Sequence, residues 1–206
     1  MKITMNSNFT FKRMLGGAVL IFIAIIQLQA AQLPSFTIIN AGLGKQFGLK
    51  VQQPAGERSL FKVSTPQGET IMSQRISDVD YSALYSLERL DEGESLFILI
   101  TSANEIRQPI RLTKRAIFYQ LSSRQVIHFP EVVQKGRQLD VNYTNPAQES
   151  FTIKLLTKGG EVYYEETFSG LADIEKRLNL LRLPAGSYDL QMRTAQGQWN
   201  EEIQLR

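Results

Sequence analysis

Apolar and polar residues alternate along much of this chain. In the segment 151–155, Phe151, Ile153 and Leu155 are separated by polar residues, and the segment 188–192 shows the same pattern. A period of two places the two sets of side chains on opposite faces of a β-strand. Glycine-containing turns interrupt such segments about every 8–12 residues, a spacing typical of a β-sandwich. We therefore predict an all-β fold, in which 171–177 could form at most one helical turn.

The alternating pattern occurs twice. Aligning the chain with itself at an offset of 92 residues, and of 93 after a one-residue insertion between Ser169 and Leu180, matches turn and strand residues throughout. A loop tolerates such an insertion, whereas a strand does not. We therefore predict an internal repeat, with glycines in equivalent turns and positive φ at one or more of them. The matched pairs include Pro54 and Pro146, Lys62 and Lys154, Thr65 and Thr157, Gly68 and Gly160, Leu87 and Leu180, Gly93 and Gly186, and Thr101 and Thr194.

The repeat predicts how the chain is divided. A first β-sandwich is expected at 35–112, a connection at 113–124 and a second β-sandwich at 125–206. The connection contains Ile117 and Phe118, and this apolar content is unusual for a free linker.

The N-terminal segment, 1–30, has the pattern of a secretory signal peptide. A basic leader precedes the apolar run from Met14 to Leu28, and small residues follow that run at Ala30 and Ala31. The alternative is a retained membrane anchor, but a helix needs about 20 apolar residues to span a bilayer and this run is shorter. The sequence therefore predicts a protein that is secreted or periplasmic, or held at the cell surface, without a membrane span after cleavage.

Cleavage of this segment is testable on the exported protein. We expect the mature N-terminus at Ala31 or Gln32, because the small residues that signal peptidase requires lie just before those positions. Intact-mass measurement of the exported chain checks this prediction and also shows whether the C-terminal unit is later removed. Recovery of Met1 on membrane-extracted protein would contradict it.

Charge and composition exclude several classes of function. The formal net charge is +3, but Lys2, Lys12 and Arg13 lie in the predicted signal peptide, so the remaining chain carries equal numbers of basic and acidic residues. This balance argues against an electrostatic nucleic-acid binder. The chain has no cysteine and a single histidine, His128, and no nucleophile or phosphate-binding motif occurs. We therefore predict no catalytic residues, no metal site and no cofactor.

Three segments of the second unit carry a family resemblance. They are Asn145-Pro-Ala, the hairpin Gly-Glu-Val-Tyr-Tyr-Glu-Glu from Gly160, and Leu183-Pro-Ala-Gly-Ser-Tyr-Asp-Leu-Gln-Met. This unit resembles the C-terminal sorting domains of type IX secretion cargo in Bacteroidetes, which are small Ig-like sandwiches. The whole chain resembles short secreted proteins of those bacteria that have two such sandwiches in tandem. The resemblance implies two Ig-like sandwiches and, for the second, a sorting or surface-attachment role.

Two aromatic residues are candidates for ligand contact. Alternation places Tyr163 opposite the row formed by Val162, Tyr164 and Phe168, and Trp199 follows the last turn. An exposed pair of rings could stack on a sugar. The alternative is that Tyr163 is a cross-strand partner and Trp199 covers one end of the core.

One strand of the first unit is apolar on both faces. Phe97 and Leu99 serve its core, yet the outward positions hold Leu96, Ile98 and Ile100, where the second copy has Asp189, Gln191 and Arg193. Three adjacent branched side chains form a patch that monomers seldom expose. The candidates for covering it are Ile117 and Phe118 of the connection, the second sandwich or another protein; the alternative is a core strand under a local loop.

The sequence therefore predicts an exported, non-catalytic interaction or structural protein whose partner is an unidentified protein or cell-surface component. Sorting or surface attachment by the second unit is the alternative function, and carbohydrate binding at Tyr163 and Trp199 is a further one.

Overall fold

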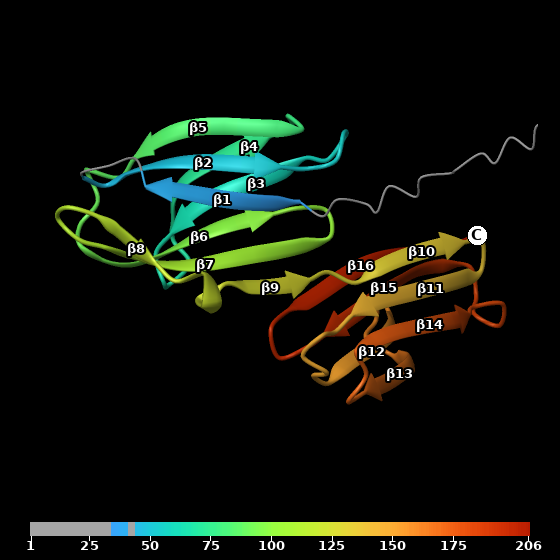
Figure 1. Ribbon diagram of the computed structural model, residues 1–206. Coiled ribbons are helices and arrows are strands. Elements are labelled where there is room, and N and C mark those ends of the chain that lie inside the picture. The colour runs from blue at the N-terminus through green and yellow to red at the C-terminus, as the bar shows by residue number, and fades with distance from the viewer. Residues whose placement is uncertain (1–33, 41–43) are drawn as a thin grey trace, which may run out of the picture. The chain divides into compact units, whose positions relative to one another are not determined.

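The structure is a computed structural model in which residues 34–40 and 44–206 are described (Figure 1). The predicted signal peptide, 1–30, lies outside the described residues. Apart from one 3-10 turn, Leu121–Ser123, the described elements are β-strands, and every described strand pair is antiparallel. This confirms the all-β prediction. None of the described helical structure is long and apolar enough to cross a membrane.

The first sandwich consists of two sheets. The smaller has the strand order β1-β2-β5, and the larger has the order β4-β3-β6-β7 with β8 and β9 on the far edge of β7 (Figure 1). The strands are β1 (Ser35–Asn40), β2 (Gln46–Gln52), β3 (Ser59–Ser64), β4 (Thr70–Ile76), β5 (Asp80–Ser86), β6 (Gly93–Ile100), β7 (Asn104–Leu112), β8 (Ile117–Tyr119) and β9 (Gln125–His128).

The second sandwich repeats this topology. Its smaller sheet has the order β10-β11-β14 and its larger sheet the order β13-β12-β15-β16. Three strands facing four, in the same order twice, define two tandem immunoglobulin-like sandwiches, as the repeat predicted. The strands are β10 (Glu131–Lys135), β11 (Gln138–Thr144), β12 (Phe151–Thr157), β13 (Val162–Phe168), β14 (Asp173–Asn179), β15 (Gly186–Arg193) and β16 (Gln198–Leu205).

Equivalent turns confirm the internal repeat. The Gly68 N–H donates to the Thr65 carbonyl at 3.0 Å, and the Gly160 N–H donates to the Thr157 carbonyl at 2.9 Å. These two glycines have φ values of 92° and 86°, in the left-handed region that a residue without Cβ adopts without steric cost. Gly93 and its counterpart Gly186 likewise match, with φ values of 150° and 151°.

The region from 171 to 177 is a strand over most of its length and not a helical turn. β14 pairs with β11 from Asp173 to Asn179. The alternation of apolar and polar residues does not predict this strand, because one of its core-facing positions is Lys176, between Ile174 and Leu178. Lys176 Nζ donates to Glu166 at 2.5 Å and lies over the ring of Tyr164, so its charge is paired at the rim of the core.

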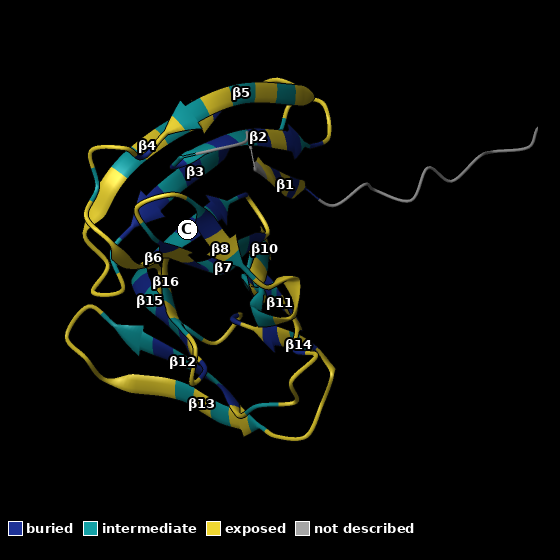
Figure 2. Ribbon diagram, turned by 60° about the vertical axis from the view of Figure 1, so that its left-hand side comes forward, coloured by how far each residue is buried: buried dark blue, intermediate teal, exposed yellow. Residues whose placement is uncertain are grey.

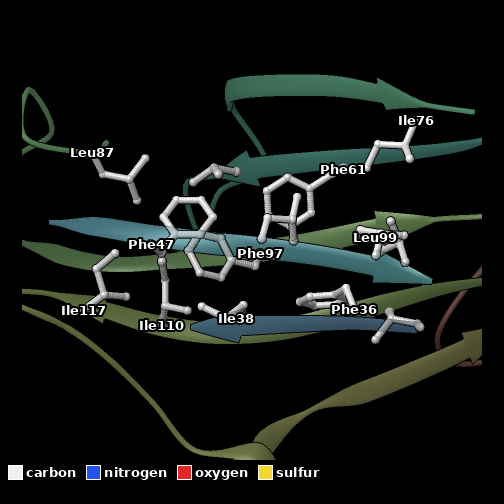
Figure 3. Close-up of a cluster of buried hydrophobic side chains, with 14 of the residues drawn as sticks. Phe36, Ile38, Phe47, Phe61, Ile76, Leu87, Phe97, Leu99, Ile110 and Ile117 are labelled. Atoms are coloured by element: carbon white, nitrogen blue, oxygen red, sulfur yellow. The ribbon is translucent and has the colours of Figure 1, made fainter. Parts of the chain in front are cut away.

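Each sandwich has its own core. In the first, Phe97 lies 4.6 Å from Phe47 and 5.6 Å from Phe61, measured between ring centroids (Figure 3). In the second, Tyr143 and Phe151 stack at 4.4 Å. The two buried clusters share no residue. Figure 2 shows the alternation of buried and exposed positions along the strands that the sequence pattern predicted.

Residues 117–128, here called the clasp, close the free edge of β7. β8 pairs with Ile110–Leu112 and β9 pairs with Asn104–Arg107, so both lie along the same strand. The sequence instead placed 113–124 in a connection and began the second unit at Gln125. These pairings lie within the larger sheet of the first sandwich, so we propose that the division between the sandwiches falls at Phe129 and Pro130.

The clasp also completes a buried polar site on β7. Gln108 is fully buried, and its side-chain Nε2 donates to the Gln120 carbonyl at 2.9 Å and to the Ser123 hydroxyl at 3.3 Å. Arg124 Nε in turn donates to Gln108 Oε1 at 3.3 Å. A buried amide costs stability unless its hydrogen bonds are made, and here the clasp makes them.

The same segment secures the edge strand β1. The Tyr119 hydroxyl donates to the Ile38 carbonyl at 2.8 Å, and Arg124 donates to the Phe36 carbonyl at 3.2 Å. The Arg124 guanidinium also lies 4.5 Å from the centre of the Phe36 ring. Two side chains of the clasp therefore satisfy backbone acceptors on β1, which among the described strands pairs only with β2.

Candidate functional site: the outer faces of the larger sheets

The first sandwich has an apolar outer surface on its larger sheet. Ile98 of β6 lies in register between Lys62 of β3 and Arg107 of β7, on the side of the sheet away from the core. On the same side of β6, Leu96 lies beside Pro109 of β7 and Ile100 lies beside Leu60 of β3. We call this surface the apolar face; its residues are Leu60, Leu96, Ile98, Ile100 and Pro109.

The apolar face is partly covered by its own sheet. Leu96, Ile98 and Ile100 are neither buried nor fully exposed. The long side chains of Lys62 and Arg107 flank the row, and their methylene groups can cover apolar surface while their charges stay in water. The sandwich itself therefore leaves part of these three side chains accessible.

The two residues that the sequence grouped with this row lie on opposite sides of the sheet. Ile117 is 2% exposed and packs in the core with Ile110 (Figure 3). Phe118 is 58% exposed and pairs in register with Arg111, so it lies on the outer side. The structure thus brings Phe118 to the same side of the sheet as Leu96, whereas Ile117 contributes to the core.

Charged residues border the apolar face. Arg107 Nε lies 2.5 Å from Glu105 Oε1, and Arg111 Nε lies 3.9 Å from Glu94 Oε1. An apolar centre with a charged rim is the usual composition of a protein–protein contact surface.

The equivalent surface of the second sandwich is polar. Lys154 Nζ lies 2.7 Å from Glu165 Oε1, and Lys158 Nζ lies 2.6 Å from Asp189 Oδ1. The hydrogen bond to Asp189 raises the pKa of Lys158 above its usual value. A shallow depression of about 480 Å³ occupies part of this face; its lining is Ser150, Thr152, Lys154, Glu165, Gln191, Arg193, Thr194, Ala195 and Gln198.

The two candidate aromatic residues lie apart. Tyr163 is 42% exposed and its ring packs edge-on against the buried Tyr188 at 5.6 Å, whereas the Trp199 ring lies 5.9 Å from Tyr143. Trp199 is in register with Met192 of β15, four residues from Tyr188 on that strand. At about 3.3 Å per residue the two sites are about 13 Å apart along the sheet. The structure does not bring these rings together, and neither lines the polar depression.

Tyr163 also lies at an irregularity that the sequence did not reveal. Leu155 pairs with Tyr164 and Leu156 pairs with Val162, so Tyr163 is an extra residue in a β-bulge. A bulge redirects the side chains around it. The alternation assumed across 162–168 is therefore interrupted at its first residues.

Within the described part of the chain, no group of three or more His, Asp or Glu side chains is arranged to hold a metal ion. His128 ends β9 and is half-buried. We find no hydroxyl or carboxylate hydrogen-bonded to it among the described residues. These two observations therefore identify no candidate catalytic group among the described residues.

No known protein family matches the sequence, and no curated protein matches it. Similar solved structures include the BSP domain of a biofilm-associated protein (14% identity, TM-score 0.29), where the match covers 84% of this chain and 29% of that one. Others are the chicken interferon gamma receptor alpha chain (10%, TM-score 0.29; 85% and 99% covered) and the FN1–FN3 domains of chicken CNTN1 (10%, TM-score 0.29; 82% and 64% covered). This chain thus spans less than a third of the biofilm-associated chain. The class of protein that the strands define is a tandem Ig-like sandwich.

Sequence reasoning missed Leu60 and Pro109 as members of the apolar face. The signal for Leu60 was present, because β3 holds apolar residues at Leu60, Phe61 and Val63 and so departs from strict alternation. Pro109 gave no signal, because its position beside Leu96 depends on the register of β6 and β7.

Proposed function

We propose that the protein is an exported, non-catalytic binding module that contacts another protein through the apolar face of its first sandwich. The observation that supports this is the difference between the two copies. At the three positions where the second copy has Asp189, Gln191 and Arg193, the first copy has Leu96, Ile98 and Ile100, on strands with the same topology.

The fold does not require apolar residues at these positions. The second sandwich forms the same sheet with polar side chains there. Folding of the sheet therefore does not explain why the first sandwich has apolar side chains at these positions. Burying one branched aliphatic side chain against a partner contributes about 1.5–3 kcal/mol. Contact with a partner accounts for the apolar row, and the charged rim supplies orientation.

A site-specific photo-crosslinker tests this proposal in cells that export the protein. With a benzophenone side chain at position 98, we expect a covalent adduct of higher mass. The same group at position 191, the equivalent site of the second copy, is the matched control and is expected to give none.

The triple variant Leu96→Asp, Ile98→Gln, Ile100→Arg carries the second copy's residues and serves as a second test. With the crosslinker at Phe118, on the same side of the sheet, we expect it to lose the adduct by more than about tenfold while remaining folded. Equal adducts from positions 98 and 191 would contradict the proposal. A crosslink from position 98 to residues 131–206 of the same chain would assign the face to contact between the sandwiches.

A further inference from the structure

We propose that the free edge of β16 in the second sandwich binds an extended, arginine- or lysine-bearing peptide segment as an additional antiparallel strand. This site is separate from the apolar face, and it takes a different kind of ligand. The chain itself contains the precedent for it.

The precedent is the clasp on β7. β7 and β16 are the equivalent last strands of the two copies, as their positions beside β6 and β15 show. In the first sandwich, β8 and β9 pair antiparallel with the far edge of β7. In the second, β16 pairs with β15, and no described strand pairs with its other edge. On that edge the Gln204 carbonyl accepts a hydrogen bond from the Gln134 side chain at 2.8 Å, so an added strand would replace this side chain there. The other outward N–H and C=O groups of an open edge are those to which an extended peptide can add.

One residue pair distinguishes the closed edge from the open one. Gln108 is in register with Phe97, and Glu201 is in register with Leu190, the residue equivalent to Phe97. Both side chains therefore point to the inner side of their sheets. Gln108 is fully buried and bonded to the clasp, whereas Glu201 is exposed and has no hydrogen-bond or ion-pair partner among the described residues.

The charge of this position indicates what the added segment carries. In the first sandwich Arg124 of the clasp donates to the neutral Gln108. In the second the same position is Glu201, a carboxylate, and desolvation by the surrounding protein atoms raises its pKa, although the side chain is still exposed to solvent. A cation placed as Arg124 is placed would form a charge-assisted hydrogen bond with this carboxylate. The neighbouring Glu202 points to the outer side of the sheet and lies 3.5 Å from Lys158, so it does not contribute to this position.

Glu201 has an alternative structural role. An inward-pointing charge on an edge strand is one of the devices by which proteins prevent unwanted pairing with other strands. In that case the edge would bind no peptide, and replacing Glu201 by a neutral residue would promote strand addition. The two roles predict opposite effects of the same substitution.

The experiment uses the chain from Ala31 to Arg206 and a fluorescein-labelled synthetic peptide with the sequence of residues 116–128. This peptide is chosen because its backbone pairs with β7 and it contains Arg124. We expect saturable binding by fluorescence anisotropy. In ¹H–¹⁵N spectra, we expect amide shifts concentrated at 197–200 and 203–205, the residues equivalent to those that β9 and β8 pair with.

The side-chain and backbone contributions are then separated. We expect the peptide with Arg124→Ala, and the protein with Glu201→Gln, each to bind about threefold to tenfold more weakly. The matched control Glu202→Gln, whose side chain points outward, is expected to change binding by less than about twofold. A peptide N-methylated at alternate residues retains its arginine and is expected not to bind, because its backbone donors are removed.

Three results would overturn the proposal. They are the absence of saturable binding, tighter binding by Glu201→Gln than by the unmodified protein, and amide shifts that lie on the apolar face. The last would support the proposed function while rejecting this site. If position 98 gives no crosslink but the peptide still binds to β16, the proposed function is rejected and this site is supported. The two proposals are therefore tested independently.

Discussion

Replacing Phe97 by alanine is expected to lower the stability of the first sandwich by about 3–5 kcal/mol. Phe97 is fully buried against Phe47 and Phe61, so truncation removes one ring of an aromatic cluster and leaves a cavity. Trp199 is the single tryptophan and packs against the second core. Urea denaturation followed by circular dichroism monitors both sandwiches, whereas tryptophan fluorescence monitors the second.

The control for this experiment is the equivalent residue of the second copy. Because the two cores share no residue, we expect Phe97→Ala to leave the fluorescence midpoint nearly unchanged. Leu190→Ala is expected to shift it, with a loss of about 2–5 kcal/mol. A fluorescence midpoint that moves with Phe97→Ala would show that the two sandwiches unfold as one unit.

The second large effect is expected at Gln108. Replacing it by alanine leaves the Gln120 carbonyl and the Arg124 guanidinium without their buried partner, so we expect a loss of about 2–3 kcal/mol. Glu201→Ala at the equivalent position is the matched control. Its expected effect is below about 0.5 kcal/mol, because Glu201 is exposed.

Chemical denaturation measures both losses. Amide hydrogen exchange at Arg111 measures whether the clasp opens. The Thr113 N–H donates to the Ala116 carbonyl, so the N–H two residues earlier on the same strand, that of Arg111, also points to β8. A loss at Gln108 no larger than that at Glu201 would show that the clasp contributes little to the first sandwich. It would also weaken the precedent on which the proposed β16 site rests.

The sequence predicted most of the strands because period-two alternation and glycine turns are local signals. The repeat strengthened these signals, since Gly68 and Gly160 mark the same turn twice. β8 and β9 were not predicted because they have three and four residues, too few for a readable alternation. Their pairing with β7 is a tertiary contact that leaves no local pattern. The strand β14 was not predicted for a different reason: the charged residue Lys176 lies on its inner face and interrupts the apolar positions.

The candidate site was predictable where it followed from comparing the copies. The apolar residues of β6 were found because Asp189, Gln191 and Arg193 occupy the same positions in β15. The placement of Ile117 and Phe118 required register, because a shift of one residue exchanges the inner and outer faces of a strand. The open edge of β16 could not be found from sequence either. This edge is recognised by comparing β16 with β7, whose equivalent edge is paired with β8 and β9.

The bonds that secure β1 constrain the order in which the first sandwich can form. The Tyr119 hydroxyl reaches a residue 81 positions earlier in the chain, and Arg124 reaches one 88 positions earlier. Contacts between such distant residues are slow to form, because a long loop must close first. A chain that is synthesised from its N-terminus contains β1 long before Arg124 is added. During that interval one edge of β1 has neither of these two side chains bound to it. The first sandwich is therefore completed by a segment that arrives just before the second sandwich begins.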